Sequence, residues 1–364
     1  MKDNISLDLK EITTVMINLL SAKLFFTFPG LLVSTSGNAA WLQVIFVSLF
    51  SLFMFYISTV IYKKCGKVSI IGISEQLGGK PLKAVMGVLL SVVLFFNLAN
   101  TIRSFPEMVK MVLLPNTPIE IIILIFAVTA GIAAYAGLNA IARIHSIFIP
   151  IVLGIMILFF IFMLPHTELY NIFPVLGKGT RNIFIKGMSG INLFEDVIVL
   201  NILLPYLESL KEAKKAGYIS IIISGIAAFL ELLTYCLVYP YPASEKFLVP
   251  IYQLTRLIGI GDFFQRFEAF FEFIWSFSVF LYLALYILVI CYVWKECFDL
   301  KYEKPIIFPM IALCVMLSFS SPGMHELLVS YRILSLYIIF MAFLMPIIMP
   351  LIYKMCIKNK RRAE

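Results

Sequence analysis

Long apolar runs alternate with short polar segments along the whole chain. A spanning α-helix needs about 20 mostly apolar residues. Ten segments are expected to cross a membrane: 11–34, 39–62, 84–112, 118–137, 144–164, 183–206, 216–239, 270–293, 305–319 and 328–352. The ninth is short and contains Pro309, so it fits the requirement least well. The pattern predicts an all-α polytopic membrane protein with ten transmembrane helices.

The composition supports the membrane class. The 364 residues are 61% hydrophobic and 14% charged, and the mean hydropathy is +0.98. Soluble domains contain about 45–50% apolar and about 25% charged residues. The net charge of +8 is read as a signal of orientation in the bilayer, so a nucleic-acid partner is not expected.

Basic residues are concentrated on one side of the predicted topology. Nineteen of the 29 lysines and arginines fall in segments 2–10, 63–83, 211–215, 295–304 and 354–362 or at Arg143. The loop STSGNA after the first span contains none. Because positively charged loops stay in the cytoplasm, both termini are predicted to be cytoplasmic.

Ten spans with both ends on one side divide into two sets of five of opposite orientation. Such a division is typical of an inverted repeat. The two predicted five-helix repeats are 11–164 and 183–352, within a single transmembrane domain of 1–364. The two halves show no clear sequence similarity to each other.

The first helix of each set carries signals of interruption. Ser21-Ala22-Lys23 and Pro29-Gly30 lie inside the first span, and KGMSGINLFEDV lies inside the sixth. Glycine lowers helix stability by about 1 kcal/mol relative to alanine. Gly187 and Gly190 therefore favour local unwinding, with close helix packing as the alternative.

Lys23 and Glu195 occupy corresponding central places in these two spans. A charge at the centre of a spanning helix costs about 2.5–3.5 kcal/mol on insertion scales. The hypothesis is that the two side chains pair, directly or through a ligand. The alternatives are that Lys23 extends its ammonium to an interface and that Glu195 is a solvated acid at a helix end.

The third span carries a polar face made by Asn97, Asn100 and Arg103 at helical spacing. Arg103 and Glu107 form an i,i+4 pair near the predicted outer surface.

The apolar segment 240–265, between the seventh and eighth spans, is expected to form an outer lid. Arg266, Glu268 and Glu272 lie around the start of the eighth span. Arg266 and Glu268 are expected to hold the lid, together with Arg103 or Glu107. The alternative for each of them is an ordinary charge at the membrane boundary.

Motifs of catalysis and cofactor binding are missing from the sequence. It has no phosphate-binding loop ending in Gly-Lys-Ser/Thr, no Cys-x-x-Cys pair among its six cysteines and no metal-ligand spacing among its three histidines. Glu195 and Asp196 are adjacent, so on a regular helix they point about 100° apart and are not expected to act as a pair. An enzyme and a cofactor are not expected.

Four segments carry a resemblance to a known family: LPNTP, GLNAIARIHSIFIPI, FEDVIVLNILLPYL and IGIGDFFQRFEAFFEFIW. Together, in this order and spacing, they resemble the B subunits of bacterial spore germinant receptors, which belong to the amino acid–polyamine–organocation superfamily. The most specific parts are Arg266-Phe267-Glu268 with Trp275, and the run from Gly137 to Ala142-Arg143. The resemblance covers the chain from the first span to the tenth.

The resemblance implies a leucine-transporter-like fold in the inner membrane of a spore, beside a lipoprotein C subunit and a larger A subunit. It also implies that a small nutrient, often an amino acid, binds at the broken first and sixth helices. The candidate ligand-binding residues are Ser21, Ala22, Lys23, Leu24, Asn97, Asn100, Ser189, Gly190, Phe194 and Glu195. The family often has small Gly-rich residues where this chain has Ser21-Ala22-Lys23, so an ammonium here either contacts the ligand's carboxylate or neutralises Glu195.

Three functions remain open at this point. The preferred one is a nutrient-sensing receptor subunit that triggers germination. The others are a secondary transporter for amino acids or polyamines, and a scaffold that only anchors partner subunits. Fold alone does not choose among them.

Overall fold

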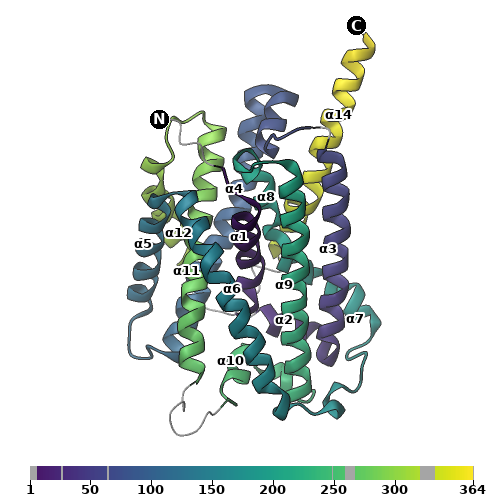
Figure 1. Cartoon of the computed structure of the whole chain (residues 1–364), viewed down its shortest axis with the longest axis vertical. Coiled ribbons are helices and arrows are strands. Elements are labelled where there is room, and N and C mark those ends of the chain that lie inside the picture. Colours follow the sequence, from purple (N-terminus) through teal and green to yellow (C-terminus); the bar gives the residue numbers. More distant parts are fainter. Residues whose placement is uncertain are drawn as a thin grey trace.

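A computed structural model describes residues 6–25, 28–63, 65–247, 249–258, 267–319 and 333–363, with side chains described up to Cys356. The described residues form a bundle of helices with no β-strand (Figure 1). A single isolated bridge joins Leu7 to Leu207, with the Leu7 N–H donating to the carbonyl oxygen of Tyr206 at 3.0 Å.

The first expected span is broken, as predicted. Helix α1 (Leu9–Ser21) begins with a capping box, in which the Asp8 carboxylate accepts from the Glu11 N–H at 2.7 Å and the Glu11 carboxylate accepts from the Asp8 N–H at 3.2 Å. A 3₁₀ turn, η1 (Ala22–Phe25), follows directly, and α2 (Phe28–Ser36) continues the path. All residues of α1 from Ile12 to Ser21 are buried, so this helix lies in the centre of the bundle (Figure 1).

The rest of the first half consists of η2 (Gly37–Ala39) and four long helices: α3 (Ala40–Tyr62), α4 (Ile70–Val112), α5 (Ile119–Ala136) and α6 (Leu138–Met163). Helix α4 is kinked at Gly78 and Gly79, where Gly79 has φ +67°. Gly137 alone, with φ +93°, connects α5 to α6. The fifth expected span, which is α6, therefore starts six residues before the predicted position 144. Arg143 lies inside this helix rather than in a loop.

The sixth span is also broken. It consists of α7 (Thr180–Phe184), η5 (Lys186–Val197), α8 (Ile198–Leu203) and η6 (Leu204–Tyr206). The 3₁₀ segment η5 coincides with the stretch KGMSGINLFEDV. Ordinary 3₁₀ runs extend over only three or four residues, so these 12 residues mark a long departure from α-helical geometry.

The second half continues with α9 (Leu210–Val238), α10 (Pro250–Thr255), α11 (Phe267–Cys297) and α12 (Ile307–Ser318). The last span, Ile333–Cys356, contains a π-helical segment, η9 (Phe340–Leu344), and enters α14 (Met345–Ala363). Short 3₁₀ turns complete the described elements: η3 (Leu164–His166), η4 (Leu169–Ile172), η7 (Ala243–Lys246) and η8 (Lys304–Ile306).

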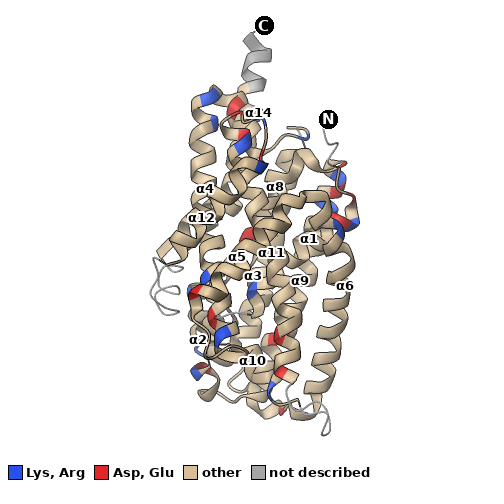
Figure 2. Cartoon of the chain, turned by 90° about the vertical axis from the view of Figure 1, so that its left-hand side faces the viewer, with Lys and Arg blue, Asp and Glu red and all other residues tan. Residues whose placement is uncertain are grey.

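Among the described residues, eight helices are long and apolar enough to cross a membrane, by length and composition. Two of the ten expected spans fall short of that criterion. The first is divided into pieces of 13, four and nine residues, with the last continuing toward α3. The ninth, α12, has 12 helical residues. Charged residues gather toward the two ends of the bundle, whereas its middle is mostly uncharged (Figure 2).

The described part of the predicted lid comprises residues 240–247 and 249–258, with η7 and α10. The Tyr235 hydroxyl donates to the Ser244 carbonyl oxygen at 2.6 Å, and α10 contacts η1, α9 and α11. Residues 259–265 and Arg266 lie outside the described residues, so the predicted contact of Arg266 with the lid stays a prediction.

Candidate functional site

Lys23 lies at the break of the first helix and points across to the break of the sixth. Its side chain is 9% exposed, and the ammonium donates to the Glu195 carboxylate. The same nitrogen lies 3.0 Å from Asp196 Oδ2 and 3.3 Å from the Asn192 backbone oxygen. The sequence-based hypothesis that Lys23 pairs with Glu195 agrees with this geometry, and Lys23 does not extend to an interface.

Glu195 and Asp196 are both fully buried, and both reach the same ammonium. The expectation that the two adjacent acids do not form a catalytic dyad stays a prediction, but η5 is not a regular α-helix and both carboxylates reach one cation. In η5 neighbouring side chains diverge, but Lys23 arrives from the facing helix and lies between their two directions. A buried carboxylate is costly unless it is paired and hydrogen-bonded, so the shared lysine stabilises both acids at this place.

Two tyrosines of α11 and an asparagine of α4 extend this cluster. The Tyr286 hydroxyl donates to Asp196 Oδ1 and accepts from Asn97 Nδ2 at 3.4 Å. The Tyr282 ring stacks on the Tyr286 ring, with their centroids 4.6 Å apart. The charged cluster, defined as Lys23, Glu195, Asp196, Tyr286 and Asn97, thus joins η1, η5, α11 and α4. Sequence reasoning missed Tyr286, because 17 tyrosines and 33 phenylalanines give no distinctive aromatic pattern.

A cavity of about 500 Å³ lies between α2, α7 and η5. Its lining includes Ser34, Lys178, Lys186, Ser189 and Asn192. The Asn192 backbone oxygen accepts from Lys23, whereas its buried side-chain Oδ1 has no hydrogen-bond partner among the described residues. Small-molecule sites are concave and occupy about 300–1,000 Å³. The cavity is therefore large enough for a small ligand, and one of its lining residues, Asn192, also contacts the Lys23 ammonium through its backbone oxygen.

The rim of the cavity is tied to the described part of the lid. The Lys178 ammonium donates to the Ser34 backbone oxygen at 2.7 Å and lies 2.6 Å from Glu245 Oε1. Glu245 belongs to η7. The ion pair links one wall of the cavity to the segment that covers this end of the bundle.

The other sequence-predicted residues lie in different surroundings. Ser21 donates to its own helix at the Ile17 oxygen, and Ala22, Leu24 and Phe194 are buried and apolar. A Cβ added to Gly190 would lie 2.9 Å from Leu32 Cδ2, so close packing explains this glycine.

Ser189 lines the cavity, whereas Asn100 lies on α4 with a buried side-chain nitrogen that has no hydrogen-bond partner in the described part of the chain. The structure therefore brings together Lys23, Glu195 and Asn97, with Ser189 nearby. Ligand binding by any of the candidate residues stays a prediction.

The predicted charge network is present in part. Arg103 Nη2 lies 3.1 Å from Glu107 Oε1, as the i,i+4 spacing indicates. Glu268 occupies the first turn of α11. Arg266 is outside the described residues, so its link to this network stays a prediction.

A second buried polar network went unnoticed in the sequence. Asn18 Nδ2 lies 3.1 Å from His145 Nε2 and donates to the Ser278 backbone oxygen at 3.0 Å, while the Ser278 hydroxyl donates to Asn18 Oδ1. His145 Nδ1 lies 2.8 Å from the Ile141 oxygen. Nδ1 must donate to this carbonyl and Nε2 must accept from Asn18, so the imidazole is neutral. This neutral network, defined as Asn18, His145 and Ser278, joins α1, α6 and α11.

A family model and individual relatives of known name all indicate the same protein family. The family model described as spore germination protein matches residues 6–324. Spore germination protein A2 of Bacillus subtilis (strain 168) is 24% identical over 265 residues, which are 71% of this chain and 72% of that protein. Spore germination protein KB of the same organism is 24% identical over 288 residues, 78% of this chain and 76% of that protein.

Solved structures show the fold. The transporter MHP1 of the nucleobase-cation-symport-1 family, closed around bromovinylhydantoin, has a TM-score of 0.66 at 12% identity, covering 94% of this chain and 78% of that one. MhsT in complex with L-phenylalanine has a TM-score of 0.63 at 14% identity, covering 94% and 98%. The predicted leucine-transporter-like fold, with broken first and sixth helices, is confirmed.

Proposed function

Because the chain belongs to the spore germination protein family and is a permease-like integral membrane protein, we propose that it is the nutrient-sensing membrane subunit of a germinant receptor. In this proposal a small amino acid binds between the broken first and sixth helices. The supporting observation is the position of the Lys23 ammonium between Glu195 and Asp196, next to a cavity of about 500 Å³.

The chemistry of the cluster suits a zwitterion. A ligand carboxylate in the cavity competes with Glu195 and Asp196 for the Lys23 ammonium, while the acids attract the ligand's ammonium group. The Asn192 side-chain oxygen supplies a further acceptor at the cavity end of the cluster. Exchange of partners would alter how η1 packs on η5, because the present contact includes the ion pair.

The signal in this proposal passes to partner proteins. A larger A subunit and a lipoprotein C subunit would respond to the altered arrangement of the two broken helices, in the inner membrane of the spore. The relatives named spore germination proteins support a role in the same process. The alternative is a secondary transporter for amino acids or polyamines, because the fold is shared with transporters.

Binding and flux measured on one preparation separate these functions. The purified protein is reconstituted into liposomes, and binding and uptake of radiolabelled amino acids are measured in parallel. Saturable binding without uptake supports the sensor, and uptake that exceeds binding stoichiometry supports the transporter. If the protein assembles with partner subunits but binds no amino acid, a scaffold that only anchors those subunits is supported instead.

The proposed orientation places both termini in the cytoplasm. Cys356, an exposed cysteine of α14, reports one end of the bundle, and a Ser34→Cys variant in a Cys356→Ser background reports the other. Ser34 is preferable to Gly37, because Gly37 has φ +61° and a Cβ there would lie 3.2 Å from the Tyr241 ring. An impermeant thiol reagent added outside cells should label the Ser34→Cys variant and spare Cys356. Labelling of Cys356 from outside would contradict the proposed orientation and indicate the opposite one.

A further inference from the structure

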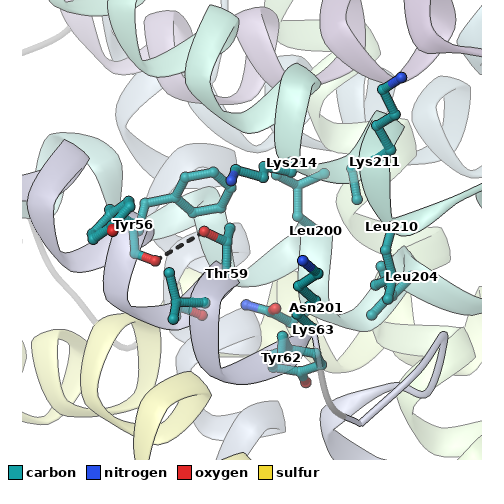
Figure 3. A pocket seen from close by; sticks show the side chains of 14 residues that line it. Tyr56, Thr59, Tyr62, Lys63, Leu200, Asn201, Leu204, Leu210, Lys211 and Lys214 are labelled. Atoms are coloured by element: carbon teal, nitrogen blue, oxygen red, sulfur yellow. Dashed lines mark hydrogen bonds between the residues drawn. The ribbon is translucent and has the colours of Figure 1, made fainter.

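A second hollow, of about 710 Å³, lies away from the charged cluster, between the end of α3, the α8–η6 segment and the start of α9 (Figure 3). It is near the end of the bundle where both chain termini lie (Figure 1). The cavity described above is lined by different residues, so the two are separate sites.

The lining of this hollow has two parts. One part is apolar and includes Phe55, Val60, Leu200, Leu204 and Leu210. The other is basic: of the fourteen residues that line the hollow, three are lysines and none is acidic. Figure 3 shows the ammonium groups of Lys63 and Lys214 beside the hollow, whereas the Lys211 side chain extends away from it at the rim.

The hollow is continuous with the apolar outer face of α3. Along this helix Leu49, Phe53, Tyr56 and Val60 are 62%, 57%, 53% and 49% exposed. In a membrane-spanning helix such a face is in contact with lipid tails. Lys63 follows directly at the end of α3 and is exposed, as are Lys211 and Lys214 in the first turns of α9. The apolar wall therefore changes to positive charge at the level where a bilayer changes from tails to headgroups.

We propose that this hollow is a binding site for one anionic phospholipid. An acyl chain occupies the apolar part, the phosphate is held by Lys63 and Lys214, and Lys211 adds positive charge at the rim. Charge complementarity selects an anionic over a zwitterionic lipid, and basic hollows between transmembrane helices are suited to acidic headgroups.

The proposed lipid site connects α3 and α9 to the second half of the broken sixth helix. Helix α8 and turn η6 continue directly from η5, which carries Glu195 and Asp196. A lipid wedged between α3 and α8 therefore contacts the second half of the broken sixth helix. Its headgroup also bridges the end of α3 to the start of α9.

The test is native mass spectrometry of the purified full chain titrated with phosphatidylglycerol or phosphatidylcholine of identical acyl chains. One phosphatidylglycerol should bind more tightly than phosphatidylcholine. A lysine near a membrane surface contributes about five-fold in affinity for anionic lipid. The triple variant Lys63→Gln/Lys211→Gln/Lys214→Gln should therefore lose roughly a hundred-fold in affinity for phosphatidylglycerol and little for phosphatidylcholine.

The matched control is Lys67→Gln/Lys215→Gln/Lys354→Gln, which removes the same charge from exposed lysines that do not line the hollow. Equal losses in the two triple variants would overturn the site in favour of general surface attraction. Displacement of the lipid by millimolar glycerol 3-phosphate would assign the hollow to a soluble phosphate instead.

A space-filling variant tests the acyl-chain part separately. Thr59→Trp projects a large ring from α3 into the hollow. It should abolish the tight phosphatidylglycerol site while the unfolding temperature in phosphatidylcholine stays within a few degrees of the unmodified protein. Retention of the tight site in this variant would overturn the proposal.

Discussion

The charged cluster and the neutral network share the central segment α1–η1, where Lys23 and Asn18 lie five positions apart, yet they differ in kind. The neutral network lies on regular helices, and its donors and acceptors match one another in a single tautomer. The charged cluster lies where both helices are broken and places one lysine between two acids. The comparison indicates that the neutral network fixes helix positions, whereas in the proposed function the charged cluster would exchange partners with a ligand.

The largest effect is expected from breaking the ion pair. Lys23→Met leaves two buried carboxylates without their shared cation, and Glu195→Gln removes one of them. Loss of one partner of a buried pair costs about 3–5 kcal/mol. Lys23→Met should therefore be the more severe variant, measured by unfolding in detergent and by folded yield.

The double variant Lys23→Met/Glu195→Gln should recover part of that loss, because a single buried acid then remains with Tyr286. A double-mutant cycle gives the coupling. Strictly additive losses would contradict the pairing as the reason for these residues.

A smaller effect is expected from Tyr286→Phe. This change keeps the ring stacked on Tyr282 but removes the hydroxyl that donates to Asp196 and accepts from Asn97. Hydrogen bonds to charged groups are worth about 1.5–3 kcal/mol. The variant should unfold at lower denaturant concentration and change ligand affinity. Tyr239→Phe, which removes a hydroxyl bonded to the Gln253 oxygen at 3.1 Å in the lid, is the matched control.

The neutral network should respond more weakly and in stability alone. Ser278→Ala removes the hydroxyl that donates to Asn18 Oδ1. Interhelical hydrogen bonds in membrane proteins average about 0.6 kcal/mol. Stability should fall by about that amount while nutrient response is unchanged. If the Ser278→Ala variant keeps its stability but loses the nutrient response, the neutral network takes part in ligand recognition and does not differ from the charged cluster in this respect.

The smallest effect, which sharpens the contrast with the fully buried cluster, concerns an ion pair between the buried Lys83 and the exposed Asp299. Lys83 Nζ lies 2.5 Å from Asp299 Oδ1 and lowers the pKa of that carboxyl through its hydrogen bond and its charge. The stabilisation is present above the usual aspartate pKa of about 3.9 and is lost as pH falls through the lower folded pKa. Asp299→Asn should therefore be slightly less stable at neutral pH and equal to the unmodified protein at the acid end of a titration. Asparagine accepts the φ of +51° found at this position. A stability difference that persists unchanged at acid pH would contradict this account.

Much of the fold was predictable because the requirements of a bilayer are severe. A central lysine and a central glutamate at matching places indicated both the breaks and their pairing. The contact of Asp196 with Lys23 was hidden, because the expected 100° between neighbouring side chains holds for an α-helix and this segment is a 3₁₀ helix. Tyr286 was hidden among many aromatic residues. The early start of α6 was hidden by Asn139 and Arg143, which look like loop residues although a single glycine makes the connection.

The bridge between Leu7 and Leu207 has a mechanical consequence. It pairs Leu7, two residues before α1, with Leu207, directly after η6, and the Leu7 N–H donates to the last residue of η6, Tyr206; both leucines are fully buried. The far ends of the two broken helices are therefore clamped together at the end of the bundle that carries the termini. If partner exchange at Lys23 and Glu195 displaced the broken helices, this end would therefore be held, and the displacement would fall on the segments beyond the breaks, α2 and α7.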